Sequence, residues 1–368
     1  MKPYRWLPFG LALVFLSGCW DQQLLKEERT ISIGGLDQDE SGMLRATVSI
    51  RDDFAVQTAV EDKNEIHTVV ARSTQNARQL INAQVAGNYS AAKMRVLLFG
   101  EDLVRNHDIM PYLDAYYRDS RSPLGARIAV TQGAAENFIR LKKVGTRTIG
   151  VFVDQLLKST KDMDITPNVN LQTLHPLDRG YDFCLPYLTS SNGIPTVDGL
   201  ALFSGVTMTG KLNIDDSRLY LLLSDVKSKN LTITLKSVNR EQASSYDFVT
   251  FAVHRFHRKL RVSVSQNRIK ATLQLKLKVY VVEDPSDHLY KMKVMHQLEK
   301  LLSKELTEKA EQVIYKMQQA NHDGFGIARR LMSYYPDFWK QINWNKEYPR
   351  VSFDTRVSLE ILNTGITE

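Results

Sequence analysis

Residues 268–281 read RIKATLQLKLKVYV, with an apolar side chain at every second position from Ile269 to Val281. Lysine, threonine, glutamine and tyrosine stand between them. Successive side chains of a strand point to opposite faces of its sheet, so this stretch predicts one long strand with a buried face and a wet face. The alternation of Leu260, Val262 and Val264 precedes it across residues 265–268, which predicts a hairpin.

The pattern changes to helical spacing after Pro285. Apolar residues recur every three or four positions, so we expect one long amphipathic helix lying on the sheet. Alternation returns in residues 351–361, which predicts a closing strand. The C-terminal part therefore reads as α+β, an antiparallel sheet with a long helix on one face. The apolar stripe of the helix is Met295, Leu298, Leu302, Leu306, Ala310, Val313 and Met317.

The N-terminal half alternates between strand and helix patterns. A hairpin is expected from residues 30–33 and 44–50. Residues 66–141 continue with strands and helices in turn, which favours a mixed sheet with helices packed on it. Residues 142–195 are looser and contain the turn sequence SSNG at 190–193, so we place a boundary near residue 195.

The expected fold class is α+β and multi-domain, with mixed and antiparallel sheets and packed helices. The leucine-rich runs 219–223 and 231–235 predict a β or mixed region beyond the boundary. The predicted parts are a signal peptide at 1–18, an N-terminal α/β domain at 19–195, a middle β-rich segment or small domain at 196–240, and a C-terminal α+β domain at 241–368.

The first 18 residues have the organisation of a bacterial lipoprotein signal. Lys2 and Arg5 precede an uncharged apolar run at residues 6–16, which is too short to span a bilayer because spanning takes about 20 apolar residues. Leu16, two small residues and Cys19 follow, which predicts cleavage before Cys19 and acylation of its thiol. The alternatives are a plain signal peptide with a coincidental cysteine and a buried N-terminal helix. Two acyl chains on Cys19 would hold the protein at the outer face of the cytoplasmic membrane.

Composition excludes several other classes. Removing residues 1–18 lowers the formal charge from +7 to +5, because Lys2 and Arg5 are lost. With 43% hydrophobic and 24% charged residues, the remainder is an ordinary globular chain. If lipid occupies Cys19, Cys184 has no disulfide partner within the chain, and we interpret it as a buried apolar residue.

No constellation in the sequence predicts catalysis, a metal site or a cofactor. His254 and His257 are three apart, but they lack the glutamate of a helical zinc protease site and lie in a strand pattern. Asp215 and Asp216 are adjacent carboxylates, but neither is paired with another acid or a histidine in a way that suggests acid–base catalysis. We therefore expect a protein that is not an enzyme and binds neither metal nor cofactor.

Positive charge is concentrated in one stretch. Residues 251–304 carry twelve basic and four acidic side chains, a surplus of +8 that exceeds the surplus of the whole mature chain. Three interpretations compete: a solvated strand face that resists unwanted pairing, a surface attracted to anionic lipid or an acidic partner, and a nucleic-acid site. Nucleic acid is not expected as a partner of an exported protein.

Several short blocks occur in a fixed order along nearly the whole mature chain. They are Gly18–Asp21, AKMRVLLFGEDL at 92–103, Tyr117-Arg118-Asp119 with Arg121, Asp198–Phe203 with Gly210–Leu212, Asp323–Gly326 with Trp339, and Thr364-Gly365. Together they resemble the Ger(x)C lipoproteins of endospore-forming bacteria, which are the C subunits of the spore germinant receptor. Each block alone is weak, and the ordered set is fairly specific.

The resemblance implies three α/β-type domains and a non-enzymatic subunit tethered at the inner spore membrane. The implied partners are a polytopic, transporter-like B subunit and a larger A subunit, with which it would sense small nutrients and trigger germination. No catalytic residue and no particular germinant carry over. Arg118, Asp119 and Arg121 follow an aromatic helix face, so we expect either a structural ion-pair network or a docking surface there.

Two other functions remain as alternatives. A free-standing solute-binding lipoprotein would capture a ligand itself, but it is expected to have two similar lobes around a cleft, and the second half does not repeat the first. An exported hydrolase would need a nucleophile, a carboxylate pair or a metal set.

Overall fold

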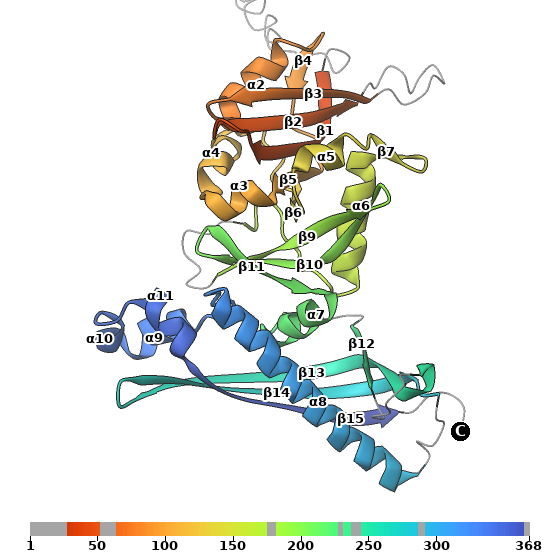
Figure 1. Ribbon diagram of the computed structural model, residues 1–368, viewed down its shortest axis with the longest axis vertical. Helices are drawn as coiled ribbons and strands as arrows, with labels where there is room; N and C mark the ends of the chain where they lie inside the picture. Colours follow the sequence, from red (N-terminus) through yellow and green to blue (C-terminus); the bar gives the residue numbers. More distant parts are fainter. Residues whose placement is uncertain are drawn as a thin grey trace, which may run out of the picture.

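The computed structural model describes residues 28–51, 64–174, 182–226, 231–236, 244–285 and 291–363. They form two large β-sheets with packed helices, one after the other along the long axis, and one short two-stranded ladder (Figure 1). The predicted signal peptide, Cys19 and Thr364-Gly365 lie outside the described residues. No helix within the described residues is long and apolar enough to cross a bilayer.

The N-terminal sheet has nine strands in the order β11-β10-β9-β6-β5-β1-β2-β3, with β4 paired to β1 beside this path. Its centre is parallel and its two ends are antiparallel hairpins, as the expected mixed sheet requires. The strands are β1 (Glu28–Gln38), β2 (Leu44–Arg51), β3 (Asn64–Ala71), β4 (Asn88–Ser90), β5 (Val96–Gly100), β6 (Arg127–Thr131), β9 (Cys184–Ser191), β10 (Ile194–Ser204) and β11 (Thr207–Asn213).

Helices cover both faces of this sheet, which explains the continuous apolar run in β5. Val96 and Leu98 belong to one core cluster, whereas Leu97 and Phe99 belong to the other, and all four are fully buried. The helices are α2 (Thr74–Asn82), α3 (Glu101–Asn106), α4 (Met110–Arg118), α5 (Ala135–Ile139) and α6 (Ile149–Asp162); the short ladder β7 (Lys143–Val144) and β8 (Arg147–Thr148) precedes α6.

The region that we expect to be loose, 142–195, contains α6 and β9. Thr148 at the N-cap of α6 makes no side-chain cap hydrogen bond, so the usual starting signal is missing. The helix is positioned by packing instead. Ile149, Val153 and Leu157 are buried, and an added Cβ at Gly150 would lie 2.9 Å from Cβ of Ser32.

The predicted middle segment, 196–240, is shared between the two sheets. Residue 195 lies inside β10, which pairs with β9, so the N-terminal sheet continues to residue 213. Strand β12 (Thr232–Lys236) already belongs to the second sheet. The described residues of this segment therefore form no third sheet, and the division into separately folding domains stays a prediction.

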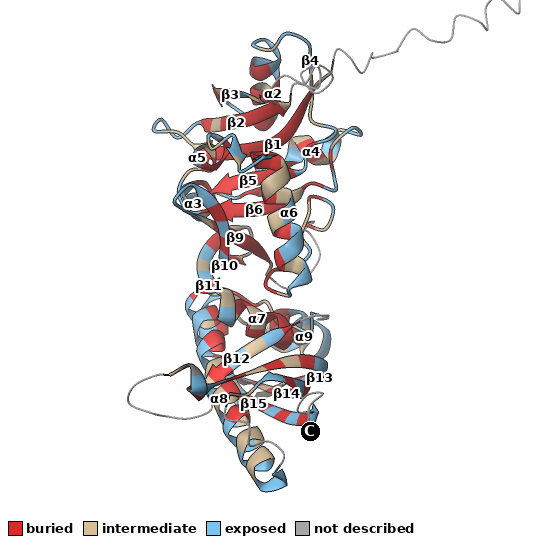
Figure 2. Cartoon of the chain, turned by 90° about the vertical axis from the view of Figure 1, so that its right-hand side faces the viewer, coloured by how far each residue is buried: buried red, intermediate tan, exposed pale blue. Residues whose placement is uncertain are grey.

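The C-terminal sheet has four strands in the order β12-β13-β14-β15. The expected hairpin is formed by β13 (Phe248–Ser265) and β14 (Arg268–Glu283), and Gln266 and Asn267 take positive φ at its turn. The expected long helix is α8 (Met292–Gln319), followed by α9 (Ile327–Tyr334), α10 (Pro336–Trp339) and α11 (Trp344–Glu347). Figure 2 shows buried and exposed residues alternating along the strands of this sheet.

The closing strand β15 (Ser352–Asn363) pairs with β14 in parallel, which contradicts the expected antiparallel sheet. The 28-residue helix α8 runs back to the end of the sheet where β14 begins, and α9 to α11 turn the chain there, so β15 enters from the same end as β14. Alternation along a strand reports which face is buried, and it carries no information about the direction of the neighbour.

Side chains of α8 cover the free edge of β15. The hydroxyl oxygens of Ser303 and Thr307 accept hydrogen bonds from the backbone N–H groups of Leu359 and Val357, at 3.0 and 3.1 Å. The Glu299 carboxylate accepts from Ile361 at 2.8 Å. An exposed strand edge invites pairing with another chain, so the helix closes this edge against association.

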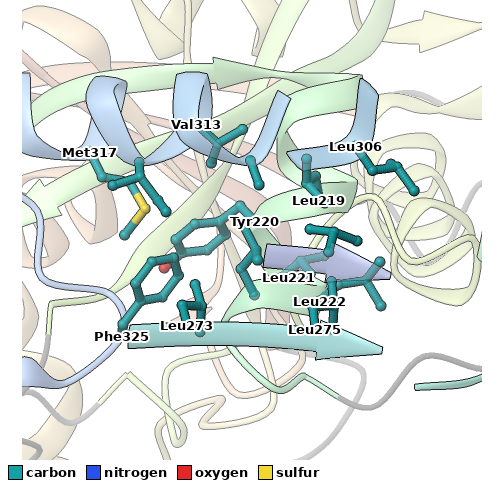
Figure 3. Packing of buried hydrophobic residues seen from close by; sticks show 14 of the residues in the cluster. Leu219, Tyr220, Leu221, Leu222, Leu273, Leu275, Leu306, Val313, Met317 and Phe325 are labelled. Atoms are coloured by element: carbon teal, nitrogen blue, oxygen red, sulfur yellow. The ribbon is translucent and has the colours of Figure 1, made fainter. Parts of the chain in front are cut away.

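The run 219–223, for which a β or mixed region is expected, lies in helix α7 (Ile214–Leu223). The Asn213 side chain accepts a hydrogen bond from the Asp216 N–H at 2.9 Å, and Asp215 and Asp216 occupy the first turn. All five residues 219–223 are buried, because α7 lies between the two sheets (Figure 3). A stretch of helix that is apolar on every side shows no helical period, so the pattern of residues 219–223 did not indicate a helix.

Candidate functional site

The three polar residues expected to act together, Arg118, Asp119 and Arg121, lie at the C-terminal end of α4. Asp119 and Arg121 line a surface pocket of about 340 Å³, together with Arg78 of α2 and Glu28 at the start of β1. The Asp119 carboxylate also accepts a hydrogen bond from the backbone N–H of Arg121 at 2.9 Å. The pocket lies at the end of the molecule farthest from the C-terminal sheet (Figure 1).

Asp119 pairs with Arg78, a residue that the sequence analysis did not single out. The two side chains approach to 3.1 Å, and the Arg78 side chain is only 10% exposed. Its guanidinium carbon stands 4.5 Å from the centroid of the Tyr116 ring, and burial raises the pKa of the Tyr116 hydroxyl. Arg78 thus joins α2 to α4 by an ion pair and a cation–π contact.

Arg118 does not join this network. It pairs with Asp114 one turn earlier on α4, at 2.9 Å, and both side chains stand mostly in water. The hydrogen bond that Arg118 donates to the Asp114 carboxylate raises the pKa of Arg118, so the guanidinium stays charged. The structure therefore brings Asp119 and Arg121 together with Arg78, and it places Arg118 apart.

The two ion pairs on α4 provide a matched test of the structural role. Asp119→Ala leaves the buried Arg78 charge without its carboxylate, and we expect a loss of about 2 kcal/mol in unfolding free energy, below the full cost of breaking a buried pair because Asp119 is partly exposed. Asp114→Ala breaks the exposed pair and should leave stability unchanged. Urea unfolding measures both. Equal urea midpoints for the two variants would contradict a structural role for the Arg78–Asp119 pair.

A second polar cluster joins the two sheets, and it contains the Asp323–Gly326 block. Asp182, just before β9, accepts from the backbone N–H of Asp323 at 2.7 Å and from the N–H of Gly205 at 2.8 Å. Its own N–H donates to the Asp323 carbonyl at 3.2 Å. One carboxylate of the N-terminal part therefore holds the β10–β11 turn against the loop after α8. We call Asp182, Tyr220, His322 and Asp323 the interdomain cluster.

The Asp323 carboxylate is used within the C-terminal part. Its two oxygens accept from the N–H groups of Ile327 and Ala328, at 2.9 and 2.7 Å, and so cap the start of α9. Burial, and to a smaller extent the charge of Asp182, raise the pKa of Asp323 to about 7. Phe325 is buried in the core, which makes the block a capping turn with an apolar plug.

His322 is held neutral. Its Nδ1 lies 2.6 Å from the Phe203 carbonyl oxygen, which can only accept, so Nδ1 carries the proton. Its Nε2 then accepts from the Tyr220 hydroxyl at 2.9 Å. Burial lowers the pKa of His322, which agrees with the neutral form. An added Cβ at Gly324 would lie 2.2 Å from the Tyr220 oxygen, so this position requires glycine.

Cys184 lies in the same core and is unreactive. It is buried, and desolvation raises the pKa of its thiol to about 12, so the thiolate is scarce at neutral pH. The interdomain cluster therefore offers neither a nucleophile nor a free carboxylate, because its polar atoms hold backbone groups. It positions the two sheets relative to each other.

Sequence reasoning missed Arg78, Asp182 and His322. Arg78 stands among helix residues as an ordinary polar position, and Asp182 lies in the region predicted to be loose. The preference of Asp for the N-cap position did not indicate Asp323 either, because the N-cap of α9 is Gly326 and Asp323 stands three residues before it. The partners of Arg78, Asp182 and His322 are between 23 and 141 residues away in sequence, so no local pattern reveals them.

Comparisons with known proteins place the whole chain. The model of the spore germination protein N-terminal domain matches residues 21–190, and the model described as spore germination B3/GerAC like, C-terminal, matches residues 198–365. Spore germination protein GerQC of Bacillus cereus is 21% identical over 99% of both chains. Spore germination protein B3 of Bacillus subtilis (strain 168) is 20% identical over 74% of both.

A solved structure supports the fold. The crystal structure of the GerBC protein superposes with a TM-score of 0.56 at 16% identity, covering 93% of this chain and 100% of that one. It shares the α+β arrangement of two domains with mixed sheets and a long C-terminal helix, and the expected fold class is thereby confirmed. With both family models matched in order, this chain belongs to the spore germination GerAC/GerBC-like family, the C subunits of germinant receptors.

Proposed function

We propose that this chain is a lipid-anchored, non-enzymatic subunit of a membrane receptor complex that senses nutrients and triggers spore germination. The main support for this proposal is that the two family models match the chain in order, between residue 21 and residue 365. The N-terminal segment before the first match is residues 1–20, and it includes the predicted acylation site Cys19. The proposed location is the outer face of the cytoplasmic membrane, which in the spore is the inner membrane.

A role in contacts agrees with how the polar groups are used. Asp323 caps α9, His322 bonds to a carbonyl oxygen and a hydroxyl, and Asp182 joins the two sheets. A catalytic group would need an atom free to meet a substrate. We infer that the chain serves by holding an A and a B subunit, and that these surfaces lie outside the interdomain cluster.

The alternative of a free-standing solute-binding lipoprotein has less support. Such a protein would use two similar lobes that close on a ligand. Here the N-terminal sheet has nine strands and the C-terminal sheet has four, in unrelated orders. The helix α7 and the interdomain cluster fill the junction with buried side chains.

Replacing the Cys19 thiol tests the anchor and the function together. Spores that carry Cys19→Ser are expected to release the chain from the membrane fraction and to lose most of their response to nutrients. Germination by a stimulus that bypasses the receptor should stay normal. The reason is that two acyl chains supply a membrane affinity that a serine cannot. Cys184→Ser is the matched control. Normal position and normal nutrient response in Cys19→Ser would refute the proposal.

A further inference from the structure

The outer face of the C-terminal sheet carries a concentrated positive charge. In the registers of β13 with β14 and of β14 with β15, the residues that share this face include eight basic and two acidic side chains. We call it the basic face. Its charged members are Arg255, Lys259, Arg261, Arg268, Lys270, Lys276, Lys278 and Arg356, with Asp354 and Glu360. All ten are exposed.

Only two of these cations face an acid across the strands. Lys270 pairs with Asp354 at 3.1 Å, and Lys278 pairs with Glu360 at 3.2 Å. The register sets Arg255 directly opposite Lys278, and like charges opposite each other destabilise a sheet. Lys276 stands opposite His257 and Ser358. The face therefore carries a surplus of charge at some expense of stability.

Protection of a strand edge explains only part of this charge. Lysines on an edge strand block pairing with other chains, and that interpretation was open from the sequence. Strand β12 pairs with β13 only over Phe248–Ala252, so Arg255, Lys259 and Arg261 lie on a stretch of β13 that pairs with β14 alone among the described strands. The lysines of β14 lie between β13 and β15, and α8 covers the edge of β15 with hydrogen bonds. Edge protection therefore does not explain the charge on β14 and β15.

The position of the predicted anchor argues against the anchoring bilayer as the surface that binds the basic face. Eight residues lie between Cys19 and Glu28, and the nine residue steps from Cys19 to Glu28 reach at most about 32 Å. From β1 to β11 the sheet spans five strand spacings, about 24 Å, and α7 with the C-terminal sheet adds about 20 Å. The C-terminal sheet lies at the opposite end of the long axis from β1 and β4 (Figure 1). The predicted anchor is therefore attached at the opposite end of the long axis from the basic face.

Apolar side chains continue the face at one end. Val282 is 61% exposed, and the Tyr280 ring contacts the His254 ring in a tilted arrangement, with centroids 4.7 Å apart. Protein interfaces combine an aromatic or aliphatic centre with charges around it, whereas a solvated face needs no such residues. Charge complementarity then requires an acidic partner.

We propose that the basic face docks a water-exposed acidic segment of a partner protein, and this rests on the proposed role as a receptor subunit. Attraction between such surfaces speeds association, sets orientation and weakens with salt. The partner segment carries several aspartates or glutamates beside an apolar residue that meets Tyr280 and Val282.

The first test compares two pairs of charge reversals. The face pair is Lys276→Glu with Arg356→Glu, neither of which faces an acid in the register. The control pair is Lys293→Glu with Lys300→Glu on the exposed side of α8, which changes the net charge equally. The probe is a labelled 20-residue polyglutamate added to the lipidated full-length chain in detergent. We expect the face pair to weaken binding at least tenfold and reduce its salt dependence, and the control pair to change it less than twofold. Equal losses would overturn the proposal.

A vesicle arm separates protein from lipid. The same chains are mixed with phosphatidylglycerol vesicles and with phosphatidylcholine vesicles. We expect the face pair to leave vesicle binding unchanged. If it abolishes binding to the anionic vesicles and leaves polyglutamate binding intact, lipid is the occupant and the proposal is wrong.

A spore arm separates this proposal from the function it rests on. Spores with the face pair, at normal levels of the chain, should respond to nutrients at least tenfold more slowly than spores with the control pair. If deletion of the chain abolishes the response while the face pair leaves it normal, the docking face is wrong and the receptor role stands. If deletion leaves the response normal, the receptor role itself fails.

Discussion

Gly199→Ala is expected to lower the unfolding free energy by about 4 kcal/mol or more, enough to prevent folding of the N-terminal part. Gly199 follows the bulge in β10 and has a φ of +140°, where side chains other than glycine are strained by about 1–3 kcal/mol. An added Cβ would also lie 2.0 Å from the carbonyl oxygen of Leu212, which is backbone of the paired strand and cannot turn away. Overpacking of this kind costs roughly 1–3 kcal/mol more.

Gly205→Ala is the matched control. Its φ is also positive, at +60°, but no atom lies within 4 Å of the added Cβ. Backbone strain alone should cost it about 1 kcal/mol. Urea unfolding followed by circular dichroism compares the two variants, and similar midpoints would show that the contact with β11 is not what requires glycine in the Asp198–Phe203 block.

Asp323→Ala is the second large effect, and its size depends on pH. The variant leaves the buried N–H groups of Ile327 and Ala328 without acceptors, and each costs about 1–3 kcal/mol. We therefore expect a loss of about 3 kcal/mol at pH 7 and loosening of α9. Asp337→Ala, which removes an exposed carboxylate on α10, should change stability little.

The sign of the pH dependence follows from the raised pKa. Asp323 has a pKa of about 7 in the folded protein and 3.8 as an ordinary aspartate, so the folded state binds the proton more tightly. Its contribution is fully present below pH 3.8 and is lost as the pH rises through 7. The alanine variant lacks this gain, so its deficit should grow by roughly 1 kcal/mol per pH unit from pH 7 to pH 5.

His322 remains in both proteins, so its opposite dependence cancels to first order in this comparison. Burial lowers the pKa of His322, and its protonation below pH 6.5 would cost both folded states alike. Denaturant titrations of wild type and Asp323→Ala at pH 5, 6, 7 and 8 measure the difference. A deficit that stays constant from pH 8 to pH 5 would mean that Asp323 is charged in the folded protein throughout this range.

Elements with a clear period were predictable from the sequence. The alternation in β14 and the stripe of α8 are local patterns, and each depends on one buried face opposite one wet face. The same holds for α2, where Ser73 accepts from the Asn76 N–H at 3.1 Å as an N-cap should. Elements buried on all sides gave no period, so α7 was expected in a β or mixed region.

The polar site was only partly predictable. Arg118, Asp119 and Arg121 share a short segment, and nearness in sequence suggested one network. In the structure Asp119 pairs with Arg78, and Arg118 pairs with Asp114. The reason is that the Arg118 side chain faces water, whereas Asp119 faces α2. The surplus of positive charge in residues 251–304 was evident from the sequence. The sequence did not show that these side chains share one face of β13, β14 and β15.

The sequence by itself determined the buried faces of the long strands, the amphipathic helix and the family. It also predicted the lipoprotein signal. Each of these depends on residues within a few positions of one another, or on motifs in order. Tertiary structure alone decided that β15 runs parallel to β14, that α7 lies between two sheets, and that Asp182 meets Asp323. The reason is physical. The direction of a strand, the burial of a helix on several sides and the hydrogen-bond partner of a carboxylate all depend on chain segments tens of residues away. The local sequence does not specify which of these segments will pack nearby.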